Sequence, residues 1–122
     1  MVTFGQATPS IYVRDMRRSL EFYCDVLGFS NVFTNGSPVC FALLQRDAAC
    51  VHLSLRPEHA GTCHAHIMLS DLDSFYDGLV SAGATVRQPP MAQEWGLRDI
   101  VAADPDGNTF EFAEVPPQSR EE

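Results

Sequence analysis

Three histidines and one glutamate stand at alternating positions of three apolar segments, where they could bind a metal or a polar ligand. His52, the pair His64 and His66, and Glu111 are each flanked by apolar neighbours. Because side chains alternate across a β-strand, these four residues are expected to face away from the core, on a shared open face. Two imidazoles and a carboxylate suit zinc, manganese, iron or nickel. The polar face of an open sheet also carries such residues for solvation alone, so both interpretations stay open.

The segments that carry these residues belong to a pattern that occurs twice, about 56 positions apart. Residues 10–16 and 66–72 each alternate between apolar and polar side chains and each contain an aspartate, Asp15 or Asp71, that is suited to cap a following helix. The spacing of apolar residues then predicts helices that end before Gly28 and Gly83. Two similar modules related by a pseudo-two-fold axis are therefore expected.

Alternation and turn residues predict the remaining elements. In the first module the strands are expected at residues 8–14, 29–34, 39–44 and 50–55, and in the second at 63–70, 85–87, 97–102 and 109–113. Residues 88–96, which include two prolines, are expected to form a loop. The fold class is therefore α+β: two βαβββ modules form a curved, mostly antiparallel sheet with the helices on the outside. Module one is expected at about 8–55, a linker at 56–62, module two at about 63–114 and a loose tail at 115–122.

The composition excludes several classes of function. A length of 122 residues fits one domain, and the net charge of −8 argues against a nucleic-acid or anionic-membrane partner. The sequence contains no apolar run of the roughly 20 residues that span a bilayer, and nothing in it resembles a signal peptide. The four cysteines form no Cys-x-x-Cys pair, so reduced thiols and a cytoplasmic location are expected.

Two segments resemble a known superfamily. Residues 12–23 with Leu27-Gly28-Phe29, and the run 104–108 followed by Glu111-Phe112, are similar to the first and second modules of vicinal-oxygen-chelate proteins. These include glyoxalase I, fosfomycin-resistance proteins, extradiol dioxygenases and bleomycin-resistance proteins. The resemblance covers residues 8–114 and is closest to the small bleomycin-resistance-like members.

The resemblance implies a candidate ligand set for a metal. The metal enzymes of the superfamily take ligands from four strand positions, which correspond here to Thr8, His52, His64 and Glu111. Thr8 departs from the pattern, because a neutral hydroxyl is a poor ligand where His, Glu or Gln is usual. The expected cofactor is therefore either none or one divalent metal: Zn, Mn, Fe or Ni. Small members are usually homodimers, and if the modules swap, His52 would come from one chain and His64 with Glu111 from the other.

Five further residues are candidates for contact with a small molecule: His66, Trp95, Tyr12, Arg98 and Met68. Trp95 is the only tryptophan, and a tryptophan in a loop can stack on a flat ligand or contact a second chain. The fourth histidine, His59, falls in the linker, where no specific role is expected.

Two functions follow from these residues. The first is a binding protein in which a homodimer holds a small, aromatic or drug-like ligand in a groove. The alternative is a divalent-metal-dependent lyase, isomerase, thiol transferase or dioxygenase that acts on a chelating substrate. The identity of the ligand is outside what the sequence determines.

Overall fold

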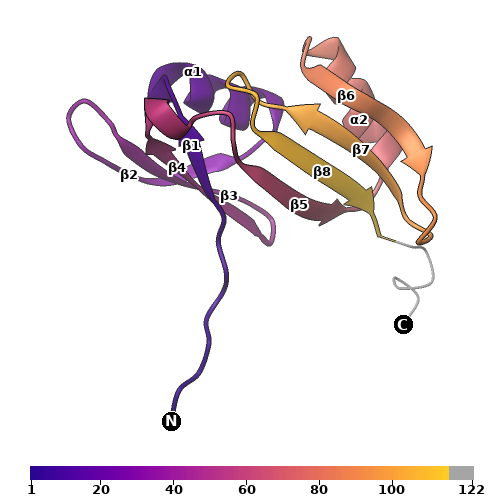
Figure 1. Cartoon of the computed structure of the whole chain (residues 1–122), viewed down its shortest axis with the longest axis horizontal. Coiled ribbons are helices and arrows are strands. Elements are labelled where there is room, and N and C mark those ends of the chain that lie inside the picture. The colour runs from indigo at the N-terminus through magenta and orange to yellow at the C-terminus, as the bar shows by residue number, and fades with distance from the viewer. Residues whose placement is uncertain (116–122) are drawn as a thin grey trace.

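The computed structural model describes residues 1–115, and its first module forms one four-stranded sheet with a helix. The elements are β1 (Ser10–Val13), α1 (Met16–Glu21), a π-helical turn (Phe22–Val26), β2 (Ser30–Asn35), β3 (Phe41–Arg46) and β4 (Ala49–Leu55). The strand order is β1-β4-β3-β2, with β1 parallel to β4 and the other pairs antiparallel. Figure 1 shows this module beside the second one.

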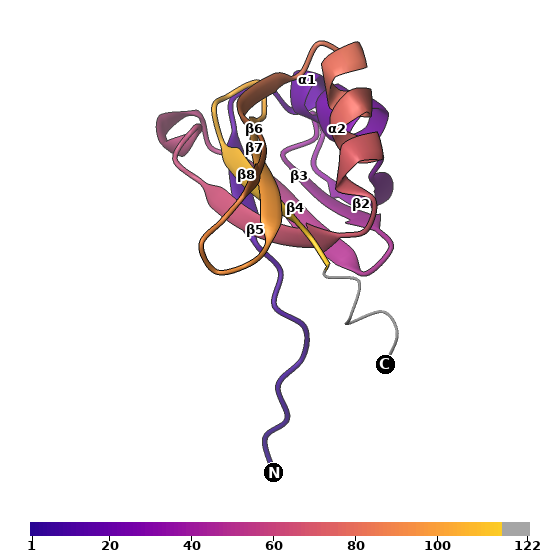
Figure 2. The same cartoon turned by 90° about the vertical axis from the view of Figure 1, so that its right-hand side faces the viewer.

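The second module repeats the first. Its elements are β5 (His64–Leu69), α2 (Leu72–Ser81), β6 (Thr85–Ala92), β7 (Arg98–Ala103) and β8 (Thr109–Glu114), and a 3-10 turn at Pro57–His59 lies in the linker. The order β5-β8-β7-β6 again has one parallel pair and two antiparallel pairs. The predicted α+β fold of two mostly antiparallel βαβββ modules is confirmed, as two mixed four-stranded sheets. Figure 2 shows both helices on one side of these sheets.

Both helices begin where the sequence predicted. The carboxylate of Asp15 accepts a hydrogen bond from the backbone N–H of Arg18 at 3.1 Å, and that of Asp71 accepts one from Ser74 at 3.4 Å. These bonds satisfy backbone donors that the first turn of a helix leaves unpaired. After the first helix, Gly28 has a φ of +78°, which a residue with a Cβ seldom adopts.

Several predicted boundaries differ from the structure: β3 spans Phe41–Arg46 rather than residues 39–44, and two others are explained by proline. The expected loop at residues 88–96 is instead strand up to Ala92, through Pro89 and Pro90. This is tolerated because β6 is an edge strand that pairs only with β7, and its register shifts between Gln88 and Met91. At the other end of the chain, β1 begins at Ser10 rather than at residue 8, since Pro9 has no N–H to donate to a ladder.

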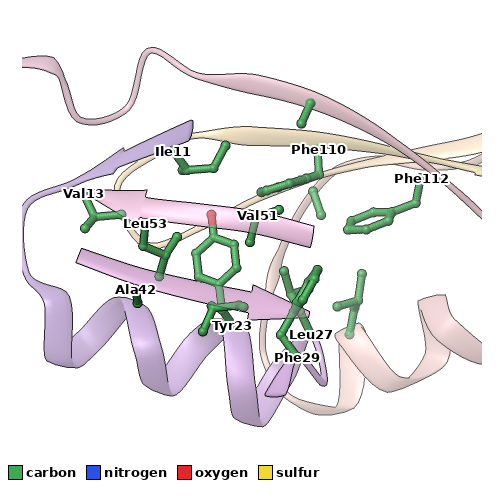
Figure 3. Close-up of a cluster of buried hydrophobic side chains, with 14 of the residues drawn as sticks. Ile11, Val13, Tyr23, Leu27, Phe29, Ala42, Val51, Leu53, Phe110 and Phe112 are labelled. Atoms are coloured by element: carbon green, nitrogen blue, oxygen red, sulfur yellow. The ribbon is translucent and has the colours of Figure 1, made fainter. Parts of the chain in front are cut away.

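The core lies between the sheets and the helices and joins both modules. Figure 3 shows the ring of Tyr23, from the π-helical turn, among strand residues of both modules. Its centroid is 5.8 Å from that of Phe110 and 6.3 Å from that of Phe29, and all three side chains are buried. Burial of each such side chain contributes roughly 1.5–3 kcal/mol, so the contact between Tyr23 and Phe110 helps to hold the two modules together.

A buried polar residue also connects the modules. Asn108, which is fully buried, donates from Nδ2 to the Tyr12 carbonyl at 2.9 Å and to Asp104 Oδ2 at 2.8 Å. Its Oδ1 accepts from the backbone N–H groups of Gly61 and Cys63, both at 3.0 Å. Asn108 therefore connects three segments: the first strand at Tyr12, the end of the linker at Gly61 and Cys63, and its own turn at Asp104.

Candidate functional site

The second sheet brings three of the predicted site residues together on its open face. His64 is paired with Thr109 and His66 with Glu111 across the β5–β8 ladder, and both histidines are exposed. The buried Ala65 lies between them on the other face. His64 Nδ1 lies 2.6 Å from the hydroxyl oxygen of Thr109. This contact orients the ring and leaves Nε2 as the nitrogen that can meet a ligand.

A second carboxylate stands on the same face, and the sequence analysis did not identify it. Asp99 on β7 is 2% exposed, and its Oδ1 accepts hydrogen bonds from Gln88 Nε2 at 2.7 Å and Gln93 Nε2 at 2.9 Å. Glu111, on the neighbouring strand β8, is close enough to perturb its pKa. Strand alternation could have indicated its position, because the neighbouring Ile100 is apolar and fully buried on the opposite face, which places Asp99 on the open face.

The two carboxyl groups have opposite pKa shifts. The shared hydrogen bond with Asp99, and after it desolvation, raises the pKa of Glu111, while the nearby charges of His66 and His64 lower it less. Burial tends to raise the pKa of Asp99, but hydrogen bonds from Glu111, Gln93 and Gln88 hold that pKa below its ordinary value. Asp99 is therefore the group that stays ionised, and Glu111 is the group that keeps a proton more readily.

The first sheet presents an aromatic row on its open face. The ring of Phe41 lies 5.0 Å from that of His52 and 6.4 Å from that of Phe33, both in edge arrangements. His52 is half-buried, between the fully buried Val51 and Leu53 that face the core. Such a row offers flat surfaces for a planar ligand.

The predicted metal ligands do not converge within one chain. Among residues 1–115, no three His, Cys, Asp or Glu side chains are close enough to hold a metal ion. His52 belongs to the first sheet, whereas His64 and Glu111 belong to the second, and Thr8 lies before β1 begins. The metal assignment therefore stays a prediction, and a single chain does not supply the site.

Tyr12 lies at the edge of the first sheet, against the linker. Its ring centroid is 5.9 Å from that of His59, and the guanidinium carbon of Arg56 lies 5.6 Å from the ring. His59, for which no role was expected, therefore packs on Tyr12. The ligand-binding role of Tyr12 stays a prediction.

Arg98 lies on the helix side of the second sheet. Its guanidinium is 2.9 Å from a carboxylate oxygen of Asp73 on α2 and 3.2 Å from one of Glu114. The hydrogen bond that Arg98 donates to Asp73 raises the pKa of Arg98, so this side chain is held as a cation in an ion-pair network. It does not share the open face with His64, and we leave it out of the proposed ligand site.

The two remaining candidates are exposed. Trp95, in the turn between β6 and β7, is 66% exposed, and Met68 on β5 is 44% exposed. Large apolar side chains in such positions are available for a ligand or for a second chain. Their contacts with a ligand stay predictions.

The structure also contains a groove of about 900 Å³ on the helix side. It lies between the π-helical turn, the β3–β4 turn, the end of β5 and α2, and Met68 is the one predicted site residue in its lining. Asp99, Glu111 and the three predicted histidines are not in its lining, so its size does not identify the site.

Known proteins with similar sequences identify the family. Residues 3–112 match the model of the Glyoxalase/Bleomycin resistance protein/Dioxygenase superfamily. A bleomycin resistance protein of Geobacillus stearothermophilus is 26% identical and is similar over 88% of this chain and 94% of its own length.

Solved structures share the fold. A bleomycin-binding protein complexed with bleomycin has a TM-score of 0.79 and 27% identity, covering 93% of this chain and all of its own. A superfamily member from Sphaerobacter thermophilus has a TM-score of 0.78 and 28% identity, covering 92% and 98% of the two chains.

Proposed function

Because the chain belongs to the glyoxalase/bleomycin resistance protein/dioxygenase superfamily, we propose that it is a small-molecule-binding protein that holds an aromatic or drug-like ligand in a groove of a homodimer. The observation that carries this proposal is the similarity to a protein solved with bleomycin, which extends over the whole of that chain. Bleomycin is the first ligand to test.

The open faces have the chemistry that such a ligand needs. The row formed by Phe33, Phe41 and His52 and the exposed Trp95 supply flat apolar surfaces. The ionised Asp99 and the net charge of −8 favour a cationic ligand over an anionic one. His64 and His66 supply polar groups that fix its orientation.

A second copy is needed to convert these faces into a groove. In one chain the aromatic row and the carboxylate pair lie on separate sheets, and none of their residues lines the groove on the helix side. We propose that the first sheet of one chain faces the second sheet of another, so that His52 of one copy and His64 with Glu111 of the other border one groove. Two such grooves per dimer would follow from two-fold symmetry.

Calorimetric titration with bleomycin tests the binding function. We expect one bleomycin per chain, no turnover of the ligand, and a change in Trp95 fluorescence that reports this residue alone because it is the only tryptophan. Trp95→Ala should weaken binding about tenfold, whereas Trp95→Phe, which keeps a flat ring, should weaken it less. Absence of binding at millimolar bleomycin would refute the proposal, and sedimentation at 13.5 kDa rather than twice that mass would refute the dimer.

One observation favours the metal-dependent alternative. Metal-binding histidines usually hydrogen-bond through their other ring nitrogen, and Thr109 provides such a partner for His64. The metal content of protein purified without chelator, and after loading with Zn, Mn, Fe(II) or Ni, tests it. One metal per chain that is lost in His64→Ala and kept in His59→Ala would support an enzyme, and no retained metal would refute it.

We also propose a cytoplasmic location. All four cysteines are free thiols in the structure, which fits a reducing compartment. In residues 1–115 no helix has the length and apolarity to span a bilayer.

A further inference from the structure

The β6–β7 hairpin carries Trp95 and has a weak ladder at its base. Pro89 and Pro90 lack backbone N–H groups, and the register of the strand pair shifts between Gln88 and Met91. Because β6 is also the edge strand, no further strand compensates for the missing bonds. On the turn side of the prolines only two residue pairs remain in the ladder, Met91 with Asp99 and Ala92 with Arg98, so side-chain bonds add to what fixes the end of this hairpin.

One carboxylate oxygen of Asp99 binds residues on both sides of the prolines. Asp99 Oδ1 accepts the side-chain amides of Gln88, which precedes the prolines, and Gln93, which opens the turn. Gln88 Nε2 also lies 3.2 Å from the Asp99 carbonyl. Asp99 is almost fully buried, so water competes little for these hydrogen bonds, and leaving any of their buried polar atoms unpaired would cost stability.

The turn itself is defined locally but needs this anchor. Gln93 N–H donates to the Leu97 carbonyl at 2.8 Å, and Gly96 N–H donates to the Gln93 carbonyl at 3.0 Å, with a φ of +98° at Gly96. This geometry closes a three-residue loop in which Trp95 is central. The Gln93 side chain thus adds a side-chain link from the loop to β7, beside the backbone pair Ala92 and Arg98.

We propose that Asp99 is a positioning residue, which fixes the Trp95 turn through Gln88 and Gln93 and so presents the indole in one orientation for the ligand. Asp99 itself lies beside Glu111, at the ligand face, and does not need to touch the ligand for this role. The inference extends the proposed function, since it concerns how the same site is preorganised. Preorganisation raises affinity by lowering the cost of ordering a side chain on binding.

Time-resolved fluorescence anisotropy tests the proposal directly, because Trp95 is the only tryptophan and excitation at the red edge, where tyrosine absorbs little, selects its emission. In the full-length protein, Asp99→Ala should increase the amplitude of fast local indole motion, and Asp99→Asn, which keeps an oxygen acceptor, should stay closer to wild type. Gln93→Ala removes one of the hydrogen bonds to Asp99 and alters only a half-buried residue. It therefore provides the same measurement if Asp99→Ala fails to fold. Glu21→Ala, exposed and remote, is the matched control and should change nothing.

Bleomycin titration of the same variants gives the second readout, with an expected loss of about tenfold in affinity for Asp99→Ala and for Gln93→Ala. Unchanged indole motion in both variants, or equal motion in Asp99→Asn and Asp99→Ala, would overturn the positioning role. If the wild-type protein binds no bleomycin, the proposed function fails, but the anisotropy result still decides the role of Asp99.

Discussion

Asn108→Ala should be among the most destabilising single changes in this protein. The substitution removes four hydrogen bonds of a fully buried side chain and leaves the carbonyl of Tyr12 and the N–H groups of Gly61 and Cys63 without that partner. Each unpaired buried group costs about 1–3 kcal/mol, and partial entry of water favours the lower value. We therefore expect a loss of about 3–4 kcal/mol, out of the 5–15 kcal/mol typical of a domain.

Thermal unfolding followed by circular dichroism measures this loss. The unfolding entropy of a chain of 122 residues is about 0.26 kcal/mol/K, so the melting temperature should fall by about 12–15 °C. Asn31→Ala, on the exposed strand β2, is the matched control and should shift it by no more than about 2 °C. A shift below about 4 °C for Asn108→Ala would refute the reasoning, because it would mean that the network between the modules contributes little.

Three other changes test separate parts of the structure. Tyr23→Phe removes a buried 2.8 Å hydrogen bond to Asp104 and should cost about 1.5 kcal/mol in urea unfolding; a cost below about 0.5 kcal/mol would contradict it. The pKa of Glu111 is raised in the folded protein, so its contribution to stability is present at acid pH and is lost as the pH rises and the carboxyl group ionises. Glu111→Gln, which removes the charge, should therefore raise the melting temperature at pH 8 but not at pH 4. An equal effect at both pH values would show that the carboxyl pair with Asp99 is not the cause. Gly61→Ala would place a Cβ 2.5 Å from a backbone oxygen at a φ of +90°, and should lower the melting temperature by at least about 4 °C, measured by calorimetry.

Several features of the fold were predictable because they depend on nearby residues. Strand alternation placed His52 and His64 away from the core, and the buried Val51 and Ala65 confirm it. The caps at Asp15 and Asp71 were equally local, since a capping side chain bonds to an N–H three residues ahead. The doubled pattern then predicted two modules of the same topology.

The errors arose where pairing partners decide the outcome. Pro89 and Pro90 suggested a loop, but an edge strand tolerates proline because one of its sides has no ladder. Arg98 shows the same dependence on partners, because its ion pairs with Asp73 and Glu114 join it to α2 and β8; its role in ligand binding stays a prediction.

The sequence by itself therefore determined the modules, the helix starts and the faces on which the imidazoles lie, because these follow from short-range periodicity and capping. Only the tertiary structure decided which groups meet: Asp99 with Gln88 and Gln93, or Asn108 with the linker. Those contacts join residues that different strands and modules bring together, and their energies come from burial, which a single segment cannot reveal. For the same reason, alternation predicts that His52 and Glu111 both face away from the core. Whether they form a common site depends on how two sheets are placed relative to each other, which the pattern of a single strand does not determine.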